Sequence, residues 1–404
     1  MQRALTLRHS LTRKKIMEPP TAVIDFVDDK TRVGRGMDGS ETTGDAAMAA
    51  MRPGVEVRCR VTRKNQNQNQ KHDDVLNAVE RGFVRNVDGV ECALRRALYA
   101  DGGDATTTTA GSGSGGARWS VGGEGGAVCV ERCGASASTR EEMTRMFFEE
   151  FNASWLAFVD SATCAMYAVG RLSGVSVDVS EDGAECACVL DGATQSATAR
   201  RVDVGGRAMD RALVEAVKAK QGIELDAKTA KEIRLTLGKC AGTREEYEAL
   251  ATGHAAECET ETFDMPDGST LKLTTELYEC GEALMRPAQE GEGVSGSIVD
   301  EICESVDKCS LEMKRVVLDH VFVHGVASRV NGLDARIMNE LTSAFPLALA
   351  PLWVTVPEYM HEDTWSHAPW TGAALLAKVI YSSNQHISKS DYNENGPPVS
   401  HRGR

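Results

Sequence analysis

Two aspartates are the first candidates for chemistry in this sequence, because each belongs to a short apolar run. Asp25 lies in residues 21–27 and Asp178 in residues 175–179, and both runs have the composition of buried strands. An aspartate near the end of such a strand can contribute a carboxylate to a ligand site, or it can shape the turn that follows. The turn is the commoner role, and the residues alone leave both interpretations open.

Three other patterns have the residue types of a site but not its surroundings. Gly111, Gly113 and Gly116 match the spacing of a dinucleotide-binding loop, yet no strand precedes them and no helix follows. The clusters that begin at His72 and His361 each place two acids beside a histidine, and such clusters in loops are usually solvated. We therefore predict neither a dinucleotide site nor a metal site.

The cysteines point to an intracellular protein. Twelve are spread along the chain, and no two have the Cys-x-x-Cys spacing of a metal or redox site. Cys186 and Cys188 lie two residues apart in a strand-like run, so they share one face and suit packing. We expect the thiols to be reduced.

Composition indicates a soluble globular protein that does not bind nucleic acid directly. Hydrophobic residues make up 42% of the chain, no apolar run approaches the ~18 residues of a membrane span, and the formal net charge of −14 repels phosphates. Only the leader at residues 1–16 is basic and free of acids. Such a leader has the composition of a mitochondrial transit peptide. The alternative interpretation is that translation begins at Met17 and the leader is not made. We favour the second interpretation, because a strand-like run begins almost at once.

Two segments interrupt the globular pattern. Residues 62–75 include an Asn/Gln alternation between lysines, and residues 101–126 are rich in Gly, Ser and Thr. Both offer little apolar surface to bury, which is typical of flexible surface insertions.

The remaining chain alternates strands and helices, which predicts an α/β fold. Thr139 and Glu142 have the spacing of a capping box, and Asp191-Gly192 predicts a hairpin that pairs residues 184–190 with 195–204. Helices are expected at 207–221, 227–239, 333–345 and 370–382, and strands at 320–323 and 352–356.

Several strings, in this order and spacing, resemble the actin superfamily. They begin at Glu80 (ERGFVRNVD), Arg140 (REEM), Phe148 (FEEFN), Tyr167 (YAVGRLSG), Arg201 (RVDVGGR), Pro266 (PDG), Glu282 (EAL) and Asp391 (DY). Each string is weak alone, but the register holds from Met17 to the last residue apart from the two insertions. The later strings PEYM, from Pro357, and AKV, from Ala377, resemble a plant nuclear branch of the actin-related proteins.

The resemblance implies an actin-like bilobal fold for residues 17–404, with duplicated mixed-sheet lobes and four subdomains. In that fold two strand–turn–strand loops hold ATP, and each needs Gly or Ser at its turn so that bare N–H groups point at the phosphates. Asp25 and Asp178 match the two aspartates near the metal ion, but Val-Asp-Asp at residues 27–29 replaces the small residues of the first loop. A carboxylate ~4 Å from a phosphate opposes binding by about 4 kcal/mol at intermediate dielectric.

Other parts of the implied nucleotide site are also changed. The position of the catalytic histidine is Glu185, and that of the glutamine that positions water is Ser161. The adenine clamp would be Thr236-Leu237, and the paired glycines under the nucleotide become Gly325-Val326. We therefore expect no hydrolysis and no tightly held cofactor. The alternative is an actin-fold protein that still binds ATP, through a remnant pocket of Asp25, Asp178, Gly206 and Gly325.

The resemblance also implies a partner groove. In actins a partner helix enters an apolar groove between the two lower subdomains. The walls of that groove would be formed here by Tyr167, Leu172, Leu375, Leu376 and Val379. The last three fit one face of the helix expected at 370–382, which suits either a groove or core packing.

The function implied by the resemblance is that of a non-catalytic subunit of a nuclear chromatin-remodelling complex of the SWI/SNF type. Such subunits pair with another actin or actin-related protein and clasp a long helix of the remodeller ATPase. Residues 46–78 would make the lengthwise contacts of a filament, but they resemble no actin loop, so we do not expect a filament former. A cytoskeletal actin-related protein, with a cytoplasmic location, is the remaining alternative.

Overall fold

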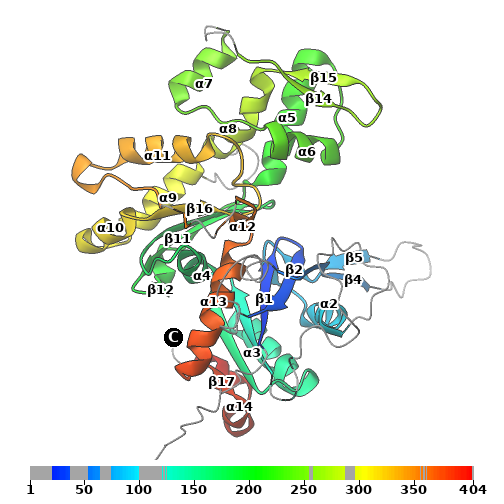
Figure 1. The fold of residues 1–404 in the computed structure, drawn as a ribbon, viewed down its shortest axis with the longest axis vertical. Helices are drawn as coiled ribbons and strands as arrows, with labels where there is room; N and C mark the ends of the chain where they lie inside the picture. The colour runs from blue at the N-terminus through cyan, green and yellow to red at the C-terminus, as the bar shows by residue number, and fades with distance from the viewer. Residues whose placement is uncertain are drawn as a thin grey trace, which may run out of the picture.

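The described chain folds into two lobes, each built on its own β-sheet (Figure 1). The computed structural model describes residues 21–36, 53–63, 74–99, 121, 123, 125–253, 258–286, 296–354, 356–357, 360 and 362–402. The leader at 1–16 and most of the two expected insertions, 62–75 and 101–126, lie outside these residues. Among the described residues, no helix has the length and apolarity needed to cross a bilayer.

The first lobe contains a six-stranded sheet and the helices that cover it. Its elements are β1 (Thr21–Val27), β2 (Lys30–Arg35), β3 (Val55–Arg58), α2 (Val87–Tyr99), β8 (Gly126–Glu131), α3 (Ala137–Arg145), β9 (Trp155–Asp160), α13 (Ala368–Ser382), β17 (Ile387–Ser388) and α14 (Lys389–Asn395). The strand order is β17-β9-β8-β1-β2-β3. Val23 packs in the cluster under α13, whereas Ile24 and Phe26 pack with α2 and α3, so β1 is buried on both faces.

The first lobe also contains two small hairpins. They are β4 (Arg60–Arg63) with β5 (Asp74–Asn77), and β6 (Val79–Glu80) with β7 (Phe83–Val84). The β6–β7 turn consists of Arg81 and Gly82, and both have positive φ. This turn becomes important at the seam between the lobes.

The second lobe is built around a sheet of five shorter strands. Its elements are β10 (Gly174–Val179), β11 (Ala184–Leu190), β12 (Ala193–Thr194), β13 (Arg200–Val202), α5 (Gly206–Gln221), α6 (Ala227–Leu237), α7 (Arg244–Ala251), β14 (Glu261–Asp264), β15 (Thr270–Leu273), α8 (Glu279–Met285), α9 (Ile298–Asp307), α10 (Leu311–Leu318), β16 (Val321–His324) and α11 (Leu333–Ala344). The strand order is β12-β11-β10-β16, with β13 also on β11. Figure 1 shows α5 to α8 and the β14–β15 hairpin at the far end of this lobe.

The two sheets repeat one arrangement. In the first lobe β1 is antiparallel to β2 and parallel to β8, and in the second β10 is antiparallel to β11 and parallel to β16. Asp25 and Asp178 occupy the first strand of each unit, opposite Val130 and His324 in the parallel partner. The predicted pair of duplicated mixed-sheet lobes is therefore confirmed.

The pair α4 (Ser161–Ala168) and α13 joins the lobes. α13 packs on β1 and β8 of the first sheet, α4 packs on β10 and β11 of the second, and the two helices have the most extensive contact of any pair of elements described. Figure 1 shows them side by side near the centre of the molecule. Gly372 permits this approach, because a Cβ there would lie 1.7 Å from the carbonyl oxygen of Cys164.

Several elements differ from their prediction for physical reasons. The capping box at Thr139 and Glu142 is wrong, because α3 begins at Ala137 with Ser136 as its N-cap. Residues 195–204 contain one short strand, β13, after a 3-10 turn at Ser196–Thr198, and the strand that directly follows the Asp191-Gly192 turn is β12; both strands pair with β11. The described residues of 352–356 form no strand. Trp353 makes an isolated bridge to Val321, and prolines at 351 and 357 limit any longer ladder.

The helix crossing predicts a large effect at Gly372. Replacement by valine should lower the free energy of unfolding by about 3 kcal/mol or more, since the opposing atom is a backbone carbonyl that cannot rotate away. Denaturant unfolding measures the change. The same replacement at Ser382, which is exposed on the same helix, should shift it by less than about 1 kcal/mol. Equal stability of the two variants would contradict the close crossing.

Candidate functional site

Two strand–turn–strand units meet at the seam between the lobes. The β1–β2 turn consists of Asp28 and Asp29, and Asp28 has a positive φ of 51°, which aspartate tolerates better than most residues. The β10–β11 turn spans residues 180–183 and is closed by a hydrogen bond from the Ser180 N–H to the Gly183 carbonyl. These are the two turns in which the sequence predicted a remnant nucleotide pocket.

The Asp28 carboxylate joins the two turns. Its Oδ1 accepts hydrogen bonds from the backbone N–H groups of Glu181, at 3.2 Å, and Asp182, at 3.3 Å. Burial, followed by the charge of Asp182, raises the pKa of Asp28 to about 6. The first turn thus places an anion on the backbone donors of the second.

Asp25 and Asp178 lie beneath the turns, and both are almost completely buried. Asp25 lies 3.7 Å from Arg32 Nη1, measured at Oδ2, and burial outweighs this arginine so that the pKa of Asp25 is raised. Asp178 forms an ion pair with Arg132, which follows β8. Burial alone would raise the pKa of Asp178, but Arg132 and then His324 outweigh it and the pKa is lowered.

The residues at the implied catalytic positions have structural contacts. Glu185 accepts a hydrogen bond from the Cys133 N–H at 3.2 Å and pairs with Arg201 at 2.8 Å. Ser161 is buried at the start of α4. The histidine nearest to Asp178 is His324, which lies 4.0 Å away and whose pKa burial lowers to about 4, so it is neutral near pH 7. The Glu185 carboxylate is thus held by two donors, one from each of two neighbouring segments.

Helix α6 presents a residue that sequence reasoning missed. At the implied adenine-clamp position, Thr236 is exposed and Leu237 packs against the lobe core. One turn earlier, Arg234 is fully buried and binds Glu181 at 2.8 Å and Asp210 at 2.6 Å. A Cβ on Gly206 would lie 2.2 Å from Glu181 Oε2 and 2.9 Å from Arg234 Nη2, so this ion pair fills the space above Gly206.

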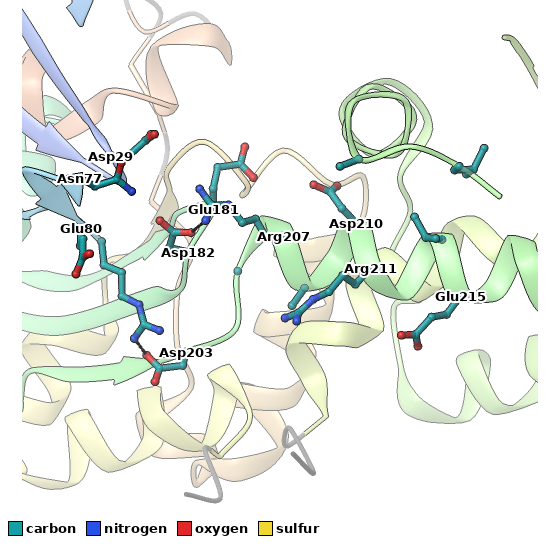
Figure 2. Close-up of a pocket in the computed structure, with 16 residues that line it drawn as sticks. Asp29, Asn77, Glu80, Glu181, Asp182, Asp203, Arg207, Asp210, Arg211 and Glu215 are labelled. Carbon is teal, nitrogen blue, oxygen red and sulfur yellow. Dashed lines mark hydrogen bonds and ion pairs between the residues drawn. The ribbon is translucent and has the colours of Figure 1, made fainter. Parts of the chain in front are cut away.

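A wide hollow opens outward from the seam, with a volume of about 750 Å³. Figure 2 shows acidic side chains from both lobes around it, including Asp29, Asp182, Asp203 and Glu215. Its lining carries seven carboxylates and three guanidinium groups, an excess of four negative charges. The volume is that of a typical small-molecule pocket, but the charge opposes a polyphosphate.

The space between the turns is far smaller, at about 20 Å³. Such a volume holds roughly one water molecule and no phosphate group. Gly325, at φ 105°, lies below it, and a Cβ there would meet Asp178 Oδ1 at 2.3 Å. The structure thus brings Asp25, Asp178, Gly206 and Gly325 to one seam, but the surrounding arginines and carboxylates fill it. These residues do not fit the ATP and divalent cation that the resemblance implies.

The predicted partner groove is only partly accessible. Leu172 and Val379 are about half exposed, at 55% and 50%, and Tyr167 and Leu375 are half-buried. Leu376 is wrong as a groove residue, because it is 5% exposed and packs in the core cluster beneath α13. Tyr167 packs against the same cluster. The i, i+1, i+4 spacing of Leu375, Leu376 and Val379 on α13 therefore includes one core position and two positions nearer the surface.

Comparisons with known proteins agree with the geometry of the fold. Residues 16–234 and 228–404 match the family model described as Actin. The chain is 30% identical over 331 residues to Actin-related protein 7 of Arabidopsis thaliana, which covers 82% of this chain and 85% of that relative. Actin-related protein 7 of Oryza sativa, in both the indica and japonica subspecies, is 30% identical over 82% of this chain and 86% of its own length.

The raised pKa of Asp28 predicts a pH-dependent effect of the Asp28→Asn variant. The amide keeps an acceptor for the two N–H groups but removes a buried charge, so the variant should be more stable than the wild type at pH 8, by roughly 2–3 kcal/mol. Because the wild-type carboxyl takes up a proton as the pH falls through about 6, the difference should disappear below about pH 4. Denaturant unfolding at several pH values measures it.

Asp226→Asn serves as the control for this experiment. Asp226 caps α6, and hydrogen bonds from Thr229 lower its pKa, so its replacement should not stabilise the protein at pH 8. An Asp28→Asn variant that is less stable than the wild type at pH 8 would show that the Asp28 charge supports the fold.

Proposed function

Because the chain belongs to the actin family, we propose that it serves as a non-catalytic actin-related subunit of a nuclear chromatin-remodelling complex of the SWI/SNF type. In this role it binds a helix of the remodeller ATPase and pairs with a second actin or actin-related protein. The observation that carries the proposal lies at the seam between the lobes. There, the β1–β2 and β10–β11 turns would hold nucleotide in an actin that binds ATP, but in this chain side chains fill the space between them.

The retained fold and the filled seam support a binding role over an enzymatic one. Hydrolysis needs a positioned water and a base, yet Glu185 is engaged by Arg201 and the Cys133 N–H, and Ser161 is buried at the start of α4. The duplicated sheets and the α4–α13 pair are complete. A partner helix binds to a groove whose form depends on the fold, and it does not require a working nucleotide site.

The surface of the α4–α13 pair offers the contact for that helix. Leu172, which follows α4, and Val379 on α13 expose large apolar side chains, and Tyr167 and Leu375 on the same two helices are half-buried. An amphipathic helix laid across them would bury its apolar face, as in other helix-in-groove complexes. The net charge of −14 favours protein partners over direct contact with DNA.

The nuclear assignment rests on the resemblance of the later motifs to nuclear actin-related proteins and on the similarity to Actin-related protein 7 of two plants. The small hairpin β4–β5 lies in the region that would make lengthwise filament contacts, and its sequence resembles no actin loop. This supports a subunit of a defined complex over a filament former.

The proposal predicts that the double variant Leu172→Asp, Val379→Asp loses its helix partner. Each replacement removes apolar burial worth about 1.5–3 kcal/mol, so binding should weaken at least roughly tenfold. The measurement is titration of the full chain with the purified helix segment of the remodeller ATPase from the same organism. Both positions are half exposed, so the melting temperature should stay close to that of the wild type.

Leu347→Asp is the matched control, because Leu347 is 92% exposed but lies outside the α4–α13 pair, in a 3-10 turn after α11. It should leave binding unchanged. Undiminished binding by the double variant would contradict the groove. Recovery of the native protein from cytoplasmic filaments, with no remodeller ATPase bound, would contradict the assignment to a nuclear complex.

A further inference from the structure

The two buried aspartates at the seam create an electrostatic problem that the fold must solve. Asp25 is 1% exposed and Asp178 is 6% exposed, and they come from opposite lobes. The negative charge of Asp178 raises the pKa of Asp25, so each carboxylate opposes ionisation of the other. In an actin-like site a divalent cation with its nucleotide would compensate such a pair. Here the residues around the pair do not fit that ligand.

Two arginines supply the positive charge instead. Arg132 pairs with Asp178, and Arg32 faces Asp25 across the β1–β2 ladder, with the guanidinium 3.7 Å from the carboxylate. Their side chains are 5% and 7% exposed, so water does little to screen either. Two guanidinium groups carry the same charge as one divalent cation. Arg32 also pairs with Glu56 at 3.2 Å, so its charge is shared between Asp25 and that glutamate.

Arg132 differs from Arg32 because it links the lobes. It follows β8 in the first lobe, and its ion-pair partner lies on β10 in the second. Burial disfavours its charge, but Asp178, Glu185 and Asp25, in that order of effect, outweigh burial and raise its pKa. Arg132 therefore carries a positive charge from the first lobe onto a carboxylate of the second, and the charge of Asp25 in its own lobe adds to its stabilisation.

The backbone around Arg132 is shaped to admit its side chain. Gly82, at φ 76° in the β6–β7 turn, lies over the guanidinium, and a Cβ there would be 2.7 Å from Arg132 Nε and 2.8 Å from the Phe26 carbonyl oxygen. The Gly82 N–H donates to the Asp28 carbonyl at 3.1 Å, which fixes this turn on the β1–β2 turn. The small hairpin therefore closes over the arginine.

We propose that Arg132 is a built-in substitute for the divalent cation of an actin-like cleft, and that it holds the two lobes together without a nucleotide. Removal of its side chain would uncover a latent divalent-cation site between Asp25 and Asp178. The inference concerns how the chain holds its own shape, and it stands whether or not the proposed remodeller partner is correct.

The test compares the melting temperature of the full chain with and without millimolar MgCl₂, CaCl₂ or guanidinium chloride. The wild type should not respond to the metals. Arg132→Ala should melt roughly 5–10 °C lower, because it leaves buried carboxylates unpaired, and each added cation should recover part of that loss. The cations are the probes, and none is needed by the wild type.

Arg81→Ala is the matched control, because Arg81 also pairs across the lobes, with Asp203, but at the surface. It should lower the melting temperature by less than about 2 °C, with no recovery by cations. If Arg132→Ala fails to fold, the double variant Arg132→Ala, Asp178→Asn should fold, because it removes both charges of the pair. The proposal is overturned if Arg132→Ala is as stable as Arg81→Ala, if cations do not recover it, or if the wild type gains as much from the metals.

Discussion

Two carboxylates buried at the seam between the lobes set the constraint on which the rest of this structure depends. The duplicated strand–turn–strand units place Asp25 and Asp178 on the two sides of that seam, both away from water. Buried charges persist only when they are compensated. Arg132 and Arg32 compensate them, and the Asp28 carboxylate takes the backbone donors of the second turn. These contacts join the two lobes at the seam, in addition to the α4–α13 pair.

The same contacts explain how an actin-family chain can keep the fold of a nucleotide-binding protein with a cleft that disfavours nucleotide. The outer hollow of about 750 Å³ is large enough for a ligand, but its lining is acidic. The inner space is about 20 Å³, and Asp28 and Arg132 both line it. A lobe angle fixed by the chain itself does not change with a nucleotide cycle. Such a subunit suits a role in which a constant shape is presented to a partner, as in the proposed remodelling complex.

Much of the fold could be predicted from the sequence, and much of the site could not. Hydrophobic periodicity placed α5, α11 and α13 to within about two residues, because each has a clear apolar face. Asp25 and Asp178 were recognisable from their apolar strands. Arg132 and Arg234 were missed, because the carboxylates that they bind are distant in sequence. Asp178 is 46 residues from Arg132, and Glu181 is 53 residues from Arg234. The signal available for Arg132 was a charged residue directly after the apolar strand β8. Leu376 was assigned to a groove because periodicity does not separate the core side of a helix from its exposed edge.

The central claim is that this fold is held closed by its own charges. It is tested most directly by the nucleotide content of the native protein, purified without added nucleotide, denatured, and analysed by chromatography. We expect well under one tenth of a molecule of ATP or ADP per chain, because the space between the turns admits roughly one water molecule. Recovery of one nucleotide per chain, together with a stoichiometric divalent cation, would contradict the claim.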